Sequence, residues 1–134
     1  MAHISAIEGI GPVYADKLIA VGIKTVEALL KRGCTPKGRK ELAEASGIDG
    51  GKILSWTNMA DLFRIKGISS QYAELLKASG VDTVKELRTR NADNLHAKIK
   101  EVNASKKLVR QVASLNQVKG FVEQAKGLEP KMTY

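Results

Sequence analysis

Apolar residues recur at helical spacing along nearly the whole chain, and glycine, proline and capping residues separate the segments. Proline at a first helical position, threonine before an apolar segment and glycine after it mark the boundaries. The pattern predicts helices over residues 12–20, 26–32, 36–46, 50–64, 70–79, 84–90 and 93–102, and a final long helix that starts at Asn103 or Ser105. No run of four or more residues alternates as a strand does, so the predicted class is all-α.

The pattern of residues 7–30 is repeated over residues 65–88, at an offset of 58. Eleven of the 24 aligned positions are identical, and they include the pairs Gly9/Gly67, Tyr14/Tyr72 and Gly22/Gly80. A repeat of this length indicates a duplicated supersecondary unit. We therefore predict two pseudo-symmetric units of about five short helices each, over residues 1–62 and 63–115.

The tail, residues 116–134, allows two interpretations. Its start echoes the apolar and glycine pattern of the second unit, with Leu115, Val118, Gly120 and Phe121 in the places of Leu62, Ile65, Gly67 and Ile68. The tail is either a truncated third copy of the turn or a helix that carries one glycine by chance. A truncated copy would act as a terminal cap or would pair with another chain.

The positive charge of the chain is concentrated in its second half. The 134 residues carry 22 Lys+Arg and 14 Asp+Glu, for a net charge of +8. Residues 1–62 hold eight basic and seven acidic side chains, whereas residues 63–134 hold 14 and seven. Such a bias favours a polyanionic partner, although a solvated surface is the alternative. The aromatic content of 4% argues against a single-strand binder built on stacking platforms.

Several other classes of protein find no support in the sequence. Cys34 is the only cysteine, which excludes a disulfide framework and a cysteine-rich metal site. No apolar run approaches the ~20 residues of a membrane span, and the first residues lack the features of a signal peptide. The two histidines, His3 and His96, lie far apart in the sequence, and no cluster has metal-ligand spacing. We therefore expect a cytoplasmic protein without a catalytic site, a metal site or a membrane partner.

The most specific motif of the chain precedes the predicted helix 12–20. The segment IEGIGPVYADKL follows the pattern apolar-x-Gly-apolar-Gly, then a small and an apolar residue, at Ile7, Gly9, Ile10, Gly11, Ala15 and Leu18. This pattern resembles the helix-hairpin-helix motif. Most of residues 4–115 also resemble an uncharacterised bacterial helix-hairpin-helix family of unknown function. The second copy, over residues 65–76, departs from the motif because Ser69 stands where the second glycine is expected.

The resemblance implies that hairpin amides hold nucleic-acid phosphates without reading the bases, often with a monovalent cation bound by hairpin carbonyls. The physical chemistry agrees, because the first N–H groups of a helix lack internal partners and the helix dipole favours an anion. The residues implied are Gly9, Gly11 and Val13 in the first hairpin, and Gly67, Ser69 and Gln71 in the second. No cofactor beyond such a cation is expected.

The charged neighbours of the two hairpins differ. Glu8 and Asp16 flank the first hairpin and would repel a phosphate, so a structural role in joining two helices is an equal alternative there. Lys66 and Lys77 accompany the second hairpin, which thus combines the poorer motif with the better charges.

Two further segments are candidates for phosphate contacts. Gly50, Gly51 and Lys52 resemble a small phosphate-binding turn at a helix start, without the spacing of a P-loop; a flexible turn is the alternative. The matching region of the second copy carries Ser105, Lys106, Lys107 and Arg110 within the most basic stretch of the chain. On a helix, at least two of these three cations would share a face, unless the stretch is simply a solvated surface.

The sequence therefore predicts a protein that binds duplex or structured DNA without sequence preference. Hairpin amides would contact the phosphates, and the lysines and Arg110 would supply the long-range attraction. The alternative is a protein-interaction or assembly module, in which the helical units and the tail join copies of the chain or dock onto a larger partner. The sequence does not separate DNA from RNA.

Overall fold

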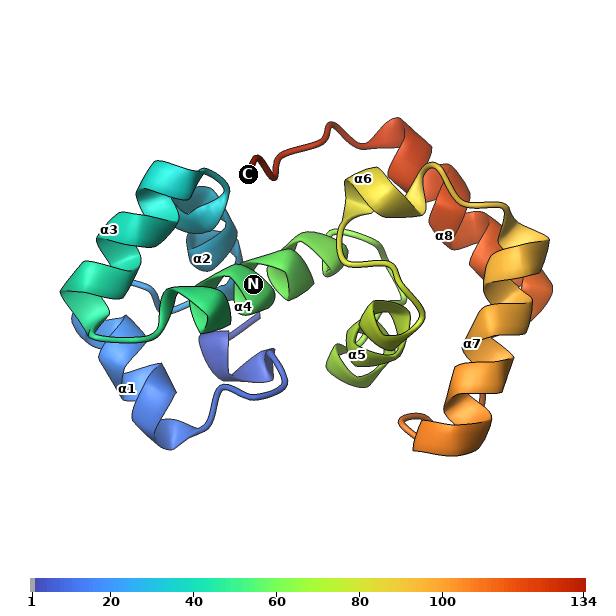
Figure 1. The fold of residues 1–134 in the computed structure, drawn as a ribbon, viewed down its shortest axis with the longest axis horizontal. Coiled ribbons are helices and arrows are strands. Elements are labelled where there is room, and N and C mark those ends of the chain that lie inside the picture. The colour runs from blue at the N-terminus through green and yellow to red at the C-terminus, as the bar shows by residue number, and fades with distance from the viewer. Residues whose placement is uncertain (1) are drawn as a thin grey trace. The chain divides into compact units, whose positions relative to one another are not determined.

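The computed structural model describes residues 2–134, and within this range the chain is built from eight α-helices and one short 3-10 helix (Figure 1). These elements are η1 (Ile4–Ala6), α1 (Pro12–Ala20), α2 (Val26–Gly33), α3 (Pro36–Ser46), α4 (Gly50–Leu62), α5 (Ser70–Ala78), α6 (Val84–Leu87), α7 (Ala92–Lys106) and α8 (Leu115–Gly127). No strand forms among the described residues, apart from an isolated bridge between His3 and Thr25. The all-α prediction is confirmed.

The chain divides into two compact units. The first unit extends to Asp61 and also contains Lys131–Tyr134, and the second unit is Leu62–Pro130. The division lies within a residue of the predicted boundary, but residues 131–134 join the first unit and the rest of the predicted tail joins the second. None of the described helices is long and apolar enough to cross a membrane.

Side-chain caps start α2 and α4 at the residues where the sequence placed them. Thr25 Oγ1 accepts a hydrogen bond from the Ala28 amide at 3.1 Å, which caps α2, and Asp49 Oδ2 accepts from the Gly51 amide at 3.0 Å, which caps α4. Such caps satisfy amides that have no partner within the helix. The core between the helices is mainly aliphatic, as the low aromatic content requires, and its fully buried side chains include Ile4, Ile7, Leu18, Ile23, Leu29, Leu42 and Ile53.

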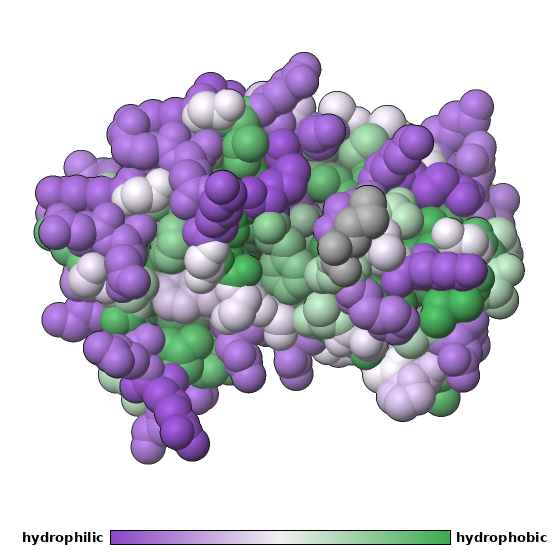
Figure 2. All heavy atoms as spheres, turned by 180° about the vertical axis from the view of Figure 1, so that it is seen from behind, coloured by the Kyte–Doolittle hydropathy of each residue, from purple (hydrophilic) through white to green (hydrophobic). Residues whose placement is uncertain are grey.

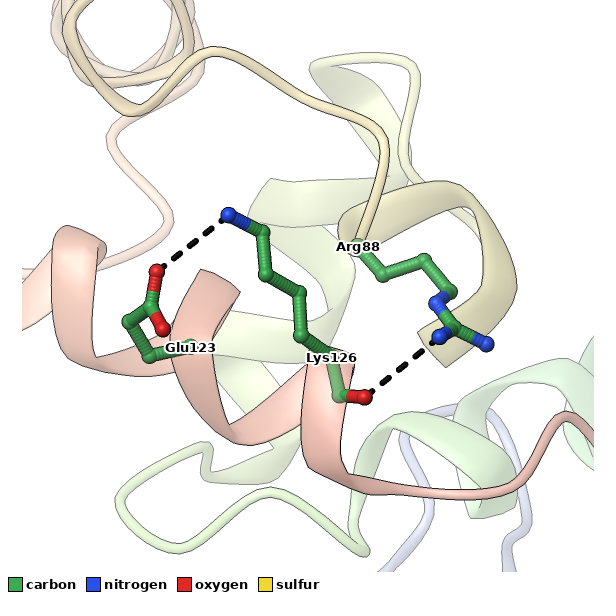
Figure 3. Close-up of polar contacts among 3 residues, drawn as sticks. All are labelled: Arg88, Glu123 and Lys126. Atoms are coloured by element: carbon green, nitrogen blue, oxygen red, sulfur yellow. Dashed lines mark hydrogen bonds and ion pairs between the residues drawn. The ribbon is translucent and has the colours of Figure 1, made fainter.

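The second unit has its own core and polar contacts that connect its helices. Its buried side chains include Ile65, Tyr72, Leu75, Leu76, Leu87, Ile99, Val118 and Phe121. Arg88, directly after α6, donates a hydrogen bond to the carbonyl of Lys126 in the last turn of α8, at 3.4 Å (Figure 3). Lys126 Nζ lies 3.2 Å from Glu123 Oε1 on the same helix. Since the last carbonyls of a helix lack internal partners, the Arg88 contact ties α6 to the end of α8.

Both copies of the repeat form the same tight turn. We call residues 7–11 the first turn and residues 65–69 the second turn. The Ile10 amide donates to the Ile7 carbonyl at 3.2 Å, and the Ile68 amide donates to the Ile65 carbonyl at 3.3 Å. Gly9 and Gly67 both have a φ of 95°, which a type II turn requires at this position and which glycine adopts without strain. The two turns therefore share one local backbone conformation, while a tandem repeat of whole, symmetric units remains a prediction.

The prediction for residues 93–114 is wrong in its helix boundaries. Instead of ending near residue 102, α7 continues to Lys106 and stops at Lys107, which has a left-handed φ of 51°. Residues 107–114 form a loop, and α8 starts after Ser114, whose side chain forms a capping box with Gln117. Asn103 starts no helix, because its side-chain amide is hydrogen-bonded to both backbone groups of Val109, at 3.0 Å each. The Ser-x-x-Gln pattern could have revealed the true start.

The interpretation of the tail as a truncated third hairpin is also wrong. Gly120, which would be its turn glycine, lies inside α8, whereas Gly67 has a positive φ in a turn. The capping box at Ser114 begins the helix well before Gly120, and the neighbours Val118 and Phe121 are buried in the core of the second unit. Residues 115–127 are thus a helix that carries an interior glycine.

Candidate nucleic-acid interface

The start of α1 is an exposed helix N-terminus without a capping side chain. Gly11 stands at the capping position, where it offers no side-chain acceptor, and Pro12 has no N–H group. The first helical hydrogen bond of α1 runs from the Ala15 amide to the Gly11 carbonyl, at 2.9 Å. The amides of Val13 and Tyr14 precede it and therefore have no partner within the helix. Gly9, Gly11 and Val13 are all exposed, and Val13 keeps 66% of its surface accessible. Such a helix start is suited to an anion.

Two lysines lie over the ring of Tyr14, a residue of the first turn of α1. The ammonium nitrogens of Lys17, on α1, and Lys52, on α4, lie 5.9 and 5.8 Å from the centroid of the Tyr14 ring. Lys52 thus comes to the Tyr14 ring from α4, although the sequence offered its segment as a separate candidate. Glu8 and Asp16 are exposed beside the same turn and oppose an anion there.

Two of the three amides of the Gly-Gly-Lys segment are bound by a neighbouring side chain. Asp49 Oδ2 accepts hydrogen bonds from the amides of Gly51 and Lys52, at 3.0 and 3.3 Å. The carboxylate therefore occupies the place that a bound anion would take. The small phosphate-binding turn at Gly50–Lys52 stays a prediction, with the Gly50 amide and the exposed side chain of Lys52 as its remaining candidate contacts.

At the second turn, side chains of the protein form hydrogen bonds with some of the backbone amides and carbonyls. Ser69 Oγ accepts from the Tyr72 amide at 3.3 Å and caps α5. The side chain of Gln124 accepts from the Lys66 amide at 2.9 Å and donates to the Lys66 carbonyl at 3.2 Å. The side chains of Lys66, Gln71 and Lys77 are exposed, as are Gly67 and Ser69. The second turn thus has the stronger positive charge, and the first turn has the more accessible amides.

The basic stretch near residue 107 lies on a loop and not on one helix face. Lys106 ends α7, Lys107 is in the left-handed region and Arg110 is in the following loop, so the predicted helical spacing of these cations is wrong. All three are exposed together with Ser105, and none of the three cations forms an ion pair with another described residue. The bonds between Asn103 and Val109 hold the loop, and its apolar residues Leu108, Val109 and Val112 pack partly buried against the core of the second unit.

A pocket of 390 Å³ opens beside the second turn, and the sequence analysis did not anticipate it. It is lined by Gly67, Tyr72, Gln111, Val112, Ala113, Ser114, Gln117 and Phe121. Tyr72 Oη accepts a hydrogen bond from the Ala113 amide at 3.3 Å. Burial raises the pKa of the Tyr72 phenol, and this hydrogen bond acts in the opposite direction. The loop 107–114 supplies half of the residues that line the pocket. The sequence pattern had predicted a helix over these residues, so it could not predict the pocket.

Among the described residues, no group of three or more His, Cys, Asp or Glu side chains could hold a metal ion.

Comparison with known protein families places the chain in a group of unknown function. Residues 8–128 match the family described as a domain of unknown function, DUF4332. The chain belongs to the DUF4332 family. The match starts within the first turn, at Glu8, and covers the second turn and all of the helices from α1 to α8, so the predicted kinship with an uncharacterised family is confirmed at this level. No curated protein and no solved structure matches the chain.

Proposed function

We propose that this member of the DUF4332 family is a helix-hairpin-helix protein that binds the DNA backbone without sequence preference. The two turns are its hairpins. The observation that carries the proposal is the exposed start of α1, which has no capping side chain and whose Tyr14 ring has the ammonium groups of Lys17 and Lys52 over it. A phosphate oxygen accepts from such amides, and both the helix dipole and the ammonium groups favour its charge.

The two units contribute differently to the attraction. The first unit holds nine basic and seven acidic side chains, and the second holds 13 and seven, so six of the eight net positive charges belong to the second unit. Hydrophilic side chains cover much of the face seen in Figure 2, with smaller hydrophobic areas between them. The exposed cations Lys66, Lys106, Lys107 and Arg110 would steer a polyanion toward the second unit.

The two hairpins would hold phosphates by different means. At the first hairpin, the amides of Val13 and Tyr14 are the donors, with Lys17 and Lys52 nearby. At the second hairpin, the Ser69 hydroxyl already caps α5, so the Lys66 side chain and the Gln71 amide carry the contact. A monovalent cation would sit at the turn carbonyls, where the Ile7 oxygen accepts one hydrogen bond and keeps a second lone pair. None of these contacts reads a base, which explains the proposed lack of sequence preference.

Binding to two unrelated duplexes over a range of salt concentrations tests the proposal. Fluorescence anisotropy should give equal affinities for both sequences, and the logarithm of the affinity should fall by roughly 0.9 per phosphate neutralised for each tenfold rise in salt. An affinity that does not change with salt, or that depends strongly on the sequence, contradicts the mechanism.

Charge reversal separates a local contact from a general effect of net charge. The double variant K106E/K107E should weaken binding more than K37E/K40E, which makes the same change in net charge on exposed positions of α3 in the first unit. Equal losses for the two variants would show that the basic loop of the second unit makes no specific contribution.

A further inference from the structure

Residues 131–134 pack onto the first unit, after the chain has completed the second (red end of the trace in Figure 1). The Thr133 amide donates a hydrogen bond to the Cys34 carbonyl at 2.8 Å, and Thr133 Oγ1 donates to the same oxygen at 3.2 Å. Met132 is buried, with 4% of its surface exposed. A segment of four residues with a backbone hydrogen bond and a buried side chain is held in a defined place.

Arg39 holds the same segment from the other side. Its side chain is 8% exposed; Nη1 donates to the Gly33 carbonyl at 2.8 Å and Nη2 donates to the Thr133 carbonyl at 2.7 Å. The guanidinium carbon lies 5.5 Å from the centroid of the Tyr134 ring. The planar guanidinium thus connects the end of α2 to the tail segment, while its face is covered by an aromatic ring.

The contacts bind backbone groups of the segment more than particular side chains. The Cys34 carbonyl and the Arg39 guanidinium bind the N–H and C=O groups of one residue, Thr133. Two side chains of the segment add to this: Met132 is an apolar anchor, and Tyr134 Oη donates to Asn58 Oδ1 at 3.0 Å. Backbone hydrogen bonds combined with side-chain anchors are the usual means of peptide recognition.

We propose that the first unit contains a docking groove for a peptide segment, formed by Cys34, Arg39 and Asn58, and that residues 131–134 of the same chain occupy it as a clasp. Residues 131–134 follow directly after Pro130, the last residue of the second unit, and non-covalent contacts alone hold them on the first unit. Tethering favours the chain's own segment over that of a second copy, because the tether raises its effective concentration at the groove. The class of ligand is a peptide that contains three consecutive residues of this kind: a methionine, then any residue other than proline, then a tyrosine.

Trypsin cleavage of the intact chain after Lys131 tests whether the clasp is closed. Thr133→Pro removes the amide that binds Cys34, whereas Thr133→Ala keeps this amide and loses only the hydroxyl contact. We expect at least a tenfold faster cleavage in T133P, with T133A close to the original chain. Circular dichroism checks that T133P stays folded. Equal cleavage rates for the original chain and T133P would overturn the clasp.

Peptide binding tests the groove itself. A labelled peptide with the sequence of residues 127–134 should bind to full-length T133P, whose groove is open, at least tenfold more tightly than to the original chain. The same peptide with proline at the position of Thr133 is the control and should bind to neither. The proposal is overturned if T133P does not bind the first peptide. It is also overturned if the original chain is a dimer whose dissociation on dilution exposes Lys131 to trypsin, because the tail of a second copy would then fill the groove. Neither experiment involves DNA, so its result is independent of the proposed function.

Discussion

The rings of Tyr14 and Trp56 meet edge to face, with their centroids 5.1 Å apart. Trp56 also supports the first turn, because a Cβ atom at Gly9 would lie 3.3 Å from its indole nitrogen. Lys52 precedes Trp56 by four residues on α4, which brings its ammonium group to the Tyr14 ring. One helix of the first unit thus supports the turn, packs against the helix that follows it and supplies a cation to the candidate phosphate site.

Alanine substitutions at Gly67 and Gly120 should have opposite effects on stability. Gly67 has a φ of 95°, and an added Cβ would lie 3.1 Å from the Phe121 ring, so we expect Gly67→Ala to cost about 1–2 kcal/mol or more. Gly120 lies in the interior of α8 with open space around it, so Gly120→Ala should stabilise by roughly 0.5–1 kcal/mol. Urea unfolding measures both. A loss of stability at Gly120 similar to that at Gly67 would contradict its place inside the helix.

An aspartate at the start of α1 should weaken DNA binding without weakening the fold. Gly11 has a φ of −83° and open space around it, so the backbone tolerates Gly11→Asp. The new carboxylate would cap α1 and stabilise the fold by about a few tenths of a kcal/mol. The same carboxylate would take the amides from a phosphate and repel it. We expect a loss of affinity of roughly tenfold at moderate salt, measured by anisotropy.

The neutral variant Gly11→Asn is the control for this experiment. It caps the helix without adding charge, so its affinity should fall between those of the original chain and Gly11→Asp. If both variants bind DNA as tightly as the original chain does, the start of α1 is not a phosphate site. Binding that still weakens with salt would then come from the lysines alone.

The stability of the second unit should fall in alkaline solution because of Tyr72. Burial raises the pKa of its phenol above the ordinary value of 10.0, so the folded state holds the proton more tightly than the unfolded state does. This contribution is fully present below about pH 10 and is lost as the pH rises through the folded-state pKa. Tyr72→Phe should remove this loss, while costing about 1–2 kcal/mol at pH 8, because the Ala113 amide loses its acceptor.

Melting temperatures between pH 8 and 11 measure the effect. The difference between the original chain and Tyr72→Phe should shrink as the pH rises, and Tyr14→Phe serves as the matched control. A constant difference over this range would show that Tyr72 does not carry the pH dependence.

Asn103 should be important for the order of the loop that carries Lys107 and Arg110. Asn103→Ala removes two hydrogen bonds to Val109 and leaves a partly buried amide without its acceptor, at a cost of about 1–2 kcal/mol. Ser105→Ala, two residues along the same helix and exposed, is the control and should change the stability little. Urea unfolding and the hydrogen-exchange rate of the Val109 amide measure the effect. An unchanged exchange rate would mean that the apolar side chains alone hold the loop.

The sequence by itself determined the features that depend on neighbouring residues. The turn glycines Gly9 and Gly67, the caps Thr25 and Asp49 and the helix after each of them were predictable, because a positive φ or a capping hydrogen bond involves residues only a few positions apart. The basic bias of the second half is likewise a property of the sequence. Where two local signals competed, the prediction failed: Asn103 and Ser114 are both plausible caps by residue type, and only Ser114 starts a helix.

Only the tertiary structure decided how the candidate surfaces are composed. The Gln124 side chain accepts a hydrogen bond from the Lys66 amide, 58 positions away in the sequence. The Lys52 ammonium group lies over the ring of Tyr14, which is on another helix, and Arg39 donates to the carbonyl of Thr133, 94 positions away. Burial of apolar side chains such as Leu108 and Val112 keeps residues 107–114 as a loop on the core of the second unit. The physical reason is that a donor or an ammonium group finds its partner only after the cores have formed, and the free energy of burying distant apolar residues is not visible in any short stretch of sequence.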